Sequence, residues 1–261
     1  MRQLKFFDGA TGLWEDVSPV VNNTALSRFE VRFDATSRPK ITELTGTFFA
    51  AAAADAEPPV IACPNVTVPC SVDALVPVTY PAPAALSDNI DSPSQIEVVY
   101  SIPSGSGFAA GVTTVTCTAK DRSGNATSTN FTVTRQALGF EGFLAPLGGA
   151  DGTGGTSATP LRTFKSGSTI PVKFLANCGG SPVVTGVHKL HALKYSDSSV
   201  AGTLIDATPQ DAATIGNAFR LVGSGWHFNL DTKGTGMTTG LWQLLCTLSD
   251  GSQHSCWIQV K

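Results

Sequence analysis

The stretch GVTTVTCTAKDRSGNATSTNFTVT, from Gly111 to Thr134, decides the fold of its segment because two alternating runs flank a turn at Asp121 to Asn125. Side chains in a β-strand point to opposite faces in turn, so each run predicts a strand with one apolar face. The inward positions of the two runs are Val115, Cys117, Ala119, Phe131 and Val133. We interpret the pair as a hairpin in the core of a two-sheet sandwich.

The composition favours short strands joined by turns. Charged residues make up 14% of the 261 residues, against about 25% in an average soluble domain. The net charge is −3 and no segment carries a basic stripe, which argues against nucleic-acid binding. No apolar run approaches the roughly 18 residues of a membrane-spanning helix, so we expect no membrane span. The first residues lack the apolar core of a signal peptide, and we expect a mature chain or one released by lysis.

The region up to residue 57 predicts a small β-rich module. Leu4 to Val17 is typical of a hairpin, because aromatic and Leu-Trp pairs flank Asp8-Gly9 and Gly12. A second pair of strands is expected from alternating Phe29, Val31 and Phe33, the turn at Ser37 to Pro39, and the run from Ile41 to Phe49.

The end of this module, Ala50 to Glu57, predicts a short helix or a plain tether. A module of under 60 residues has a limited core. We therefore expect residues 1–57 to dock onto a partner chain or to form a homo-oligomer.

The middle segment carries motifs of a known family. They are PPVIACP at Pro58 to Pro64, VTYPAP at Val78 to Pro83, Ser87-Asp88-Asn89, SIPSGSGFAAGVTTVTCT at Ser101 to Thr118, and Asp121 to Val133. Over residues 58–136 the chain resembles the hyalin repeat (HYR) domain. The resemblance implies an immunoglobulin-like β-sandwich of surface proteins that is associated with adhesion and has no catalytic residues. Ile90 and Thr129 stand where many members have cysteines, which suggests that one disulfide of the family is lost as a unit. The resemblance still allows a disulfide between Cys63 and Cys117.

The last segment, residues 137–261, resembles the PxKF domain through FKSGSTIPVKF at Phe164 to Phe174. That resemblance implies a second β-rich surface module, whose function is not defined. Period-2 alternation places apolar residues on one face of each strand: Ile170, Val172, Phe174, Ala176, Cys178, Trp226, Phe228, Leu230, Trp242, Leu244, Cys246, Leu248, Cys256, Ile258 and Val260. The predicted fold class is therefore all-β, with tandem immunoglobulin-like sandwiches behind a small β-rich N-terminal anchoring module.

The six cysteines are divided evenly between two modules: Cys63, Cys70 and Cys117 in the middle, and Cys178, Cys246 and Cys256 in the last. Each odd count allows one bridge within a module and leaves a thiol over, unless the modules are cross-linked. Buried free thiols are an equally ordinary interpretation. If the turn at Asp250-Gly251 has three residues, Cys246 lies opposite Cys256, but either could instead meet Cys178. Possible disulfide residues are thus Cys63, Cys117, Cys246 and Cys256.

We expect no catalytic, cofactor or metal site. The histidines form no recognised motif, and in a β-rich chain His188 and His191 are expected at the surface. Asp88, Asn89 and Asp91 could supply oxygen ligands to calcium, but these residue types are also what a turn requires. Asp121 with Asn125 is likewise interpreted as a turn device.

The leading hypothesis is a non-enzymatic phage virion protein of the capsid decoration or head-fibre type, placed on the virion surface. Residues 1–57 would contact virion or surface proteins, and the other modules would bind glycans or a host surface weakly through many copies. The alternative is a bacterial cell-surface adhesin or spacer that binds glycans or proteins. A glycan-active enzyme would require a catalytic domain beyond these modules.

Overall fold

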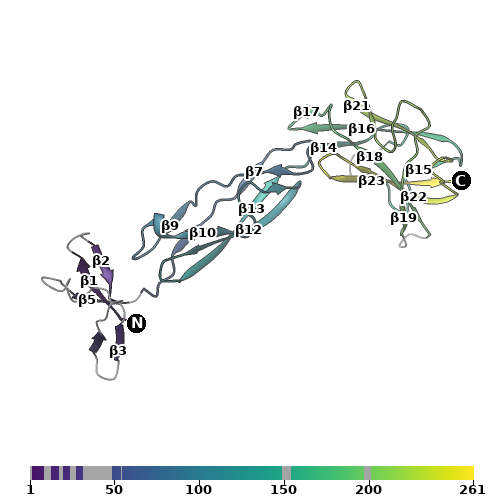
Figure 1. Cartoon of the computed structure of the whole chain (residues 1–261). Helices are drawn as coiled ribbons and strands as arrows, with labels where there is room; N and C mark the ends of the chain where they lie inside the picture. Colours follow the sequence, from purple (N-terminus) through teal and green to yellow (C-terminus); the bar gives the residue numbers. More distant parts are fainter. Residues whose placement is uncertain are drawn as a thin grey trace. The chain divides into compact units, whose positions relative to one another are not determined.

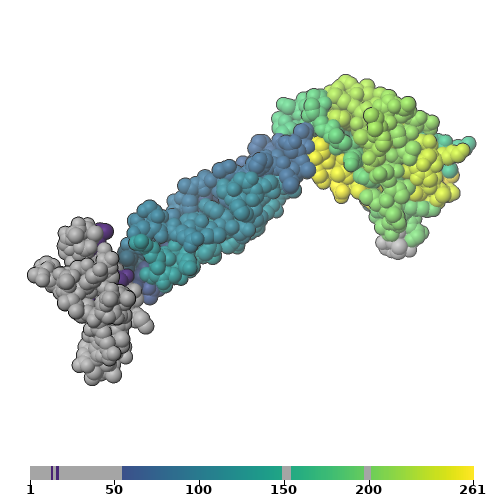
Figure 2. Space-filling view, viewed as in Figure 1, coloured from purple at the N-terminus to yellow at the C-terminus, as the bar shows by residue number. Residues whose placement is uncertain are grey.

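The computed structural model describes residues 2–8, 13–17, 20–23, 28–31, 49–53, 55–148, 154–196 and 201–261. Strands make up nearly all of the regular structure in these residues, together with one 3-10 turn, η2 (Pro93–Gln95) (Figure 1). The chain is all-β, as the alternating patterns predict. Figure 2 shows the middle segment in blue to teal and the last segment in green to yellow.

The chain divides into two compact units. One contains residues 1–61, 85–98 and 118–128, and the other contains residues 62–84, 99–117 and 129–261. This division passes through the middle segment, because its longest strands contribute residues to both units. The proposed module boundaries at 1–57, 58–136 and 137–261 therefore remain a prediction.

The first five strands form a three-stranded sheet and a separate two-stranded sheet. A three-stranded sheet has the order β2 (Leu13–Asp16), β1 (Arg2–Asp8) and β5 (Phe49–Ala53). A separate antiparallel pair consists of β3 (Val20–Asn23) and β4 (Arg28–Val31). The antiparallel register of β1 on β2, with Lys5 opposite Asp16, confirms the predicted first hairpin. Its turn at residues 9–12, and Phe33, Ser37 to Pro39 and Ile41 to Thr47 of the second predicted pair, lie outside the described residues.

The expectation of a helix or plain tether from Ala50 to Glu57 is wrong for its first half. Residues 49–53 form β5, which pairs antiparallel with β1, and Leu4 lies opposite Ala51. Alanine has the highest intrinsic helix propensity, but that preference is small in energy, and the hydrogen bonds offered by a neighbouring strand override it. Residues 55–59 follow in extended, irregular conformation.

The middle segment contains one larger sheet and two short pairings. The larger sheet has the order β10 (Glu97–Tyr100), β12 (Gly111–Lys120), β13 (Ala126–Arg135) and β7 (Val66–Val68), with β7 parallel to β13. The short pairings are β11 (Gly107–Phe108) with β8 (Val76–Pro77), and β6 (Val60–Ala62) with β9 (Ala85–Ser87).

The hairpin predicted from Gly111 to Thr134 is confirmed as β12 and β13. Its turn is closed by the Asp121 N–H, which donates to the Asn125 carbonyl at 3.1 Å. Gly124 has a φ of +92°, which a residue with a Cβ rarely adopts. All five predicted inward side chains are buried: Val115, Cys117, Ala119, Phe131 and Val133.

Aromatic rings complete this core. Tyr80, from the VTYPAP motif, lies with its ring centroid 5.0 Å from those of Tyr100 and Phe131, in edge-to-face geometry. Its hydroxyl donates to the carbonyl of Ile102 at 3.1 Å. The edge-to-face pairs and the satisfied hydroxyl explain why a tyrosine can be buried at this position.

The last segment is a sandwich of two sheets. One has the order β14 (Gly139–Phe143), β16 (Thr169–Cys178), β21 (Gly225–Asp231) and β20 (Arg220–Val222), with β17 (Ser181–Pro182) on β16. The other has the order β15 (Arg162–Phe164), β23 (Gln253–Val260), β22 (Gly240–Thr247), β18 (Lys189–Tyr195) and β19 (Ala201–Asp206).

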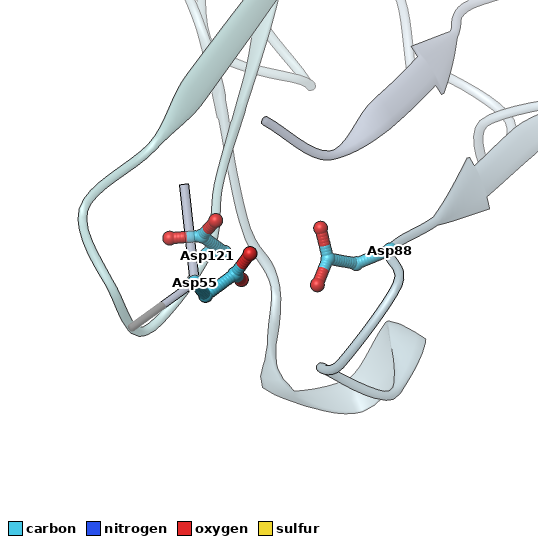
Figure 3. A group of neighbouring side chains, drawn as sticks. All are labelled: Asp55, Asp88 and Asp121. Atoms are coloured by element: carbon cyan, nitrogen blue, oxygen red, sulfur yellow. The ribbon is translucent and has the colours of Figure 1, made fainter. Parts of the chain in front are cut away.

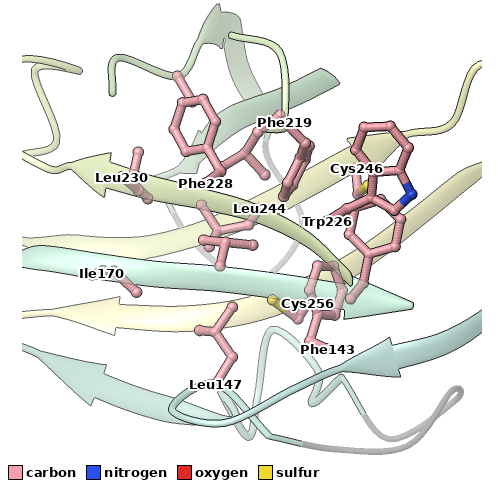
Figure 4. Close-up of a cluster of buried hydrophobic side chains, with 14 of the residues drawn as sticks. Phe143, Leu147, Ile170, Phe219, Trp226, Phe228, Leu230, Leu244, Cys246 and Cys256 are labelled. Carbon is pink, nitrogen blue, oxygen red and sulfur yellow. The ribbon is translucent and has the colours of Figure 1, made fainter. Parts of the chain in front are cut away.

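The core of this sandwich contains the predicted apolar faces of both sheets (Figure 4). Every residue on the predicted inward list except Cys178 is buried. Cys178 is half-buried and packs against the edge of this core. The period-2 alternation therefore identified the core of this segment.

Candidate functional site

Three aspartates from separate parts of the chain meet in one place. Asp55 precedes β6, Asp88 follows β9, and Asp121 follows β12 (Figure 3). One carboxylate oxygen from each lies within 4.8 Å of those from the other two. Asp121 is buried, and Asp55 and Asp88 are half-buried. We call these three residues the acidic cluster. Its donors are all carboxylate oxygens, the ligand type that hard cations prefer.

Asp88 is held by the loop that it begins. Its Oδ2 atom accepts hydrogen bonds from the backbone N–H groups of Asp91, at 2.9 Å, and Ile90, at 3.0 Å. These bonds lower the pKa of the Asp88 carboxyl below its usual value, because they stabilise the charged form. The side chain is therefore oriented by its own turn and carries a negative charge at neutral pH.

Asp121 and Asp55 are connected through Asn125. The Asp121 carboxylate accepts two bonds of 2.8 Å from Asn125, one from the backbone N–H and one from the side-chain amide. The same amide donates to the Asp55 carbonyl at 3.3 Å. Asp55 also accepts the Glu57 N–H at 3.1 Å through its own Oδ1. The hairpin turn thus positions two members of the cluster.

The acidic cluster differs from the set that sequence spacing suggested. Of Asp88, Asn89 and Asp91, only Asp88 belongs to it. The Asp91 carboxylate instead accepts the Arg122 N–H at 2.9 Å. Consecutive turn residues point in different directions, whereas the cluster collects residues that are far apart in the sequence. Asp121 and Asn125 do form the predicted turn, and Asp121 also belongs to the acidic cluster.

Arg135 is a buried residue that sequence analysis missed. Only 1% of it is exposed, at the end of β13. Its guanidinium donates to the carbonyls of Ala74, at 2.9 Å, Phe108, at 3.1 Å, Ser71, at 3.0 Å, and Asp73. Five fixed donors allow arginine to join several carbonyls at once, so this side chain anchors the loop at residues 71–74.

Two disulfides involve the cysteines of the middle segment. Cys63 is bonded to Cys117. Cys70 is bonded to Cys178, so the middle and last segments are covalently joined, as the odd counts allowed. Val72, two residues after Cys70, packs against the core of the last segment. The loop held by Arg135 is therefore fastened to the last segment by a bond and by an apolar contact.

Cys246 and Cys256 are buried free thiols. The strands pair Cys246 with His254 and Leu244 with Cys256, because β22 and β23 are last paired at Thr247 and Gln253. The loop is centred on Asp250, where the Leu248 N–H donates to the Ser252 carbonyl at 2.8 Å, and not on Gly251, so the two cysteines do not lie opposite each other. Burial raises the pKa of the Cys256 thiol to about 12 and raises that of Cys246 as well.

His188 is not at the surface, contrary to expectation. It is fully buried, its Nδ1 accepts the Ser249 N–H at 3.1 Å, and its ring centroid lies 4.3 Å from that of Trp226. Burial lowers its pKa to about 4, although the nearby Asp250 acts in the opposite direction. His191 is half-buried, with its Nε2 3.3 Å from the Asp206 carboxylate. Alternation shows which side of a strand a residue occupies, but not that an imidazole can fill a core position.

The motifs of the middle segment, the Tyr80 core and the Gly124 turn all lie within residues 58–136. Residues 54–135 match the HYR domain. The matched residues contain the whole acidic cluster, the Cys63 to Cys117 disulfide and Arg135. Comparison with curated protein sequences finds no match. The PxKF resemblance of residues 137–261 remains a prediction.

Several solved structures are similar over most of the chain. The Bacteroides ovatus mixed-linkage glucan utilization locus SGBP-B, in complex with a mixed-linkage heptasaccharide, is 13% identical over 78% of this chain and 48% of that one, with a TM-score of 0.22. The protocadherin gamma B2 extracellular cadherin domains 1–5 are 10% identical over 83% of this chain and 43% of that one, with a TM-score of 0.26. The tandem Ig repeats of Dlar are 14% identical over 79% of this chain and 99% of that one, with a TM-score of 0.23. The chain spans less than half the length of the first two.

No helix in the described part of the chain has the length and hydropathy that crossing a membrane requires.

Proposed function

We propose that this chain is a non-enzymatic adhesive surface protein that displays immunoglobulin-like β-sandwiches. The observation that carries the proposal is the match of residues 54–135 to the HYR domain. The strands also bury apolar side chains in internal cores and expose hydroxyl and amide groups. Thr116 pairs with Asn130, and Thr118 with Ser128, across the outer face of the hairpin, each at 2.8 Å. A polar, weakly charged face suits low-affinity contacts that gain strength from many copies.

The test is binding without turnover. The full chain is run in native gels that contain one of a panel of neutral and acidic polysaccharides, and the same polysaccharides are incubated with it in solution. We expect retarded migration in at least one gel and no release of reducing ends. Release of reducing ends, reproducible in independent preparations, would contradict a non-enzymatic role.

We further propose that the protein is a virion component of the decoration or head-fibre type, in which residues 1–57 dock to the particle and the PxKF-like residues 137–261 extend the displayed surface. The small sheet formed by β1, β2 and β5 supports this, because so few strands offer little core of their own. A chain that starts at residue 54 keeps the acidic cluster but lacks that sheet. It should fail to sediment with particles that retain the full chain, and equal sedimentation of both would refute the docking role.

A bacterial cell-surface adhesin or spacer is the second candidate. The disulfides Cys63 to Cys117 and Cys70 to Cys178 favour it, because disulfides form and persist outside the reducing cytosol. Trapping thiols in intact cells before lysis separates the two candidates. An adhesin is oxidised while the cells are alive, whereas a virion protein is reduced until the cells lyse.

A further inference from the structure

We propose that Asp55, Asp88 and Asp121 bind a calcium ion, which holds residues 55–57 against the 88–91 loop and the hairpin turn of the HYR domain. The site goes beyond the proposed adhesive role, because calcium binding can be measured without any adhesion partner. It combines residues that come together only through the fold (Figure 3).

The first argument is electrostatic. Three carboxylates present oxygens that all lie within 4.8 Å of one another. Carboxylates are ionised at neutral pH, and like charges at this distance repel unless a proton or a cation lies between them. The backbone N–H groups of Ile90 and Asp91 fix the orientation of the Asp88 carboxylate beside the other two.

The second argument is independent of charge and concerns unsatisfied atoms. Asp55 Oδ2 and Asp88 Oδ1 are each buried, and neither has a hydrogen-bond partner. A buried carboxylate oxygen without a partner loses its hydration and receives nothing in return. A cation bound between the carboxylates supplies the missing interaction for both atoms at once.

In Asp55 and Asp88, one carboxylate oxygen is hydrogen-bonded to the backbone and the other is left without a partner. Asp55 uses Oδ1 to accept the Glu57 N–H, and Asp88 uses Oδ2 to accept two backbone N–H groups. In both residues the other oxygen is the unsatisfied one. Asp121 has both oxygens bonded to Asn125, yet two carboxylate oxygens offer about four acceptor positions. Each side chain is thus held by local bonds and keeps capacity for an ion.

Coordination chemistry favours calcium over magnesium, because magnesium demands near-ideal octahedral geometry and gives up its water reluctantly, whereas calcium accepts irregular oxygen sets. Calcium binds oxygens at about 2.3–2.6 Å, so two of its ligands can be about 5 Å apart, whereas magnesium ligands at 2.0–2.1 Å reach only about 4.2 Å. The three oxygens lie within 4.8 Å of one another, which is inside the reach of one calcium ion, with water completing its coordination. Three protein carboxylates are few for a calcium site, and we expect a dissociation constant of about 0.1–1 mM, as in extracellular modules.

The test uses the full chain and calcium chloride, with binding measured by titration calorimetry and unfolding by thermal melts in calcium or EDTA. We expect one saturable site, a higher melting temperature in calcium, and slower amide exchange at residues 55–57, 88–91 and 121–125. Magnesium at the same concentration should bind at least tenfold more weakly. No saturation by 5 mM calcium, or equal binding of both ions, would overturn the proposal.

Asp88→Asn is the informative variant. Its amide oxygen can still accept from Ile90 and Asp91, which directs the NH₂ group to the place of the unsatisfied oxygen. We expect it to fold, to melt in EDTA at a temperature no lower than the wild type, and to bind calcium at least tenfold more weakly. Glu97→Gln is the matched control, because it removes one charge from an exposed position of the same domain. Equal calcium affinity of the two variants would refute the site.

Discussion

His188 should make the stability of the last segment depend on pH. The ring is fully buried beside Trp226, and its pKa is lowered from 6.5 to about 4. Between these values the unfolded chain binds a proton that the folded chain does not. Stability is therefore retained above pH 6.5 and is lost as the pH falls towards 4. The linkage relation gives a loss of about 2 kcal/mol between pH 7 and pH 5.

The assay is urea unfolding at pH 7 and pH 5, followed by tryptophan fluorescence. Three of the four tryptophans, Trp226, Trp242 and Trp257, lie in the last segment, so most of the signal reports its unfolding. His188→Asn is the comparison, because its amide oxygen can accept the Ser249 N–H while the side chain does not titrate. The wild type should lose about 2 kcal/mol more than the variant between the two pH values. The same pH dependence in both proteins would refute the assignment.

Three further predictions concern the junction and the thiols. Arg135→Lys should lower the free energy of unfolding by at least about 3 kcal/mol in urea melts, because one ammonium cannot serve the four carbonyls; a loss below 1 kcal/mol would contradict the anchoring role. Replacing Cys70 and Cys178 together by serine should cost about 4 kcal/mol, from a cross-link that spans 108 positions, and an unchanged melting temperature would contradict it. Iodoacetamide at pH 8 should label no cysteine in the native protein, and should label two, Cys246 and Cys256, after unfolding without reductant. Labelling is measured by mass spectrometry, and labelling of either cysteine in the native protein would contradict their burial.

Local patterns failed where a neighbouring element changed the outcome. Residues 50–53 have a composition that suits a helix, yet β1 offers them a strand pairing. His188 looks polar in the sequence, yet it is buried in the core, where its Nδ1 accepts the backbone N–H of Ser249. The cysteines of the last hairpin are not opposite each other because the loop is centred on Asp250, a position that residue types alone do not set.

The sequence by itself determined the all-β class, the hairpin around Gly124 and the inward faces of the long strands, because period-2 alternation and turn chemistry are properties of neighbouring residues. It also carried the HYR motifs. Only the tertiary structure brought Asp55, Asp88 and Asp121 together. The same holds for the Cys70 to Cys178 bond and for the carbonyls around Arg135. These contacts join positions tens of residues apart, and whether such residues meet depends on how the strands are ordered and packed, which no local period encodes.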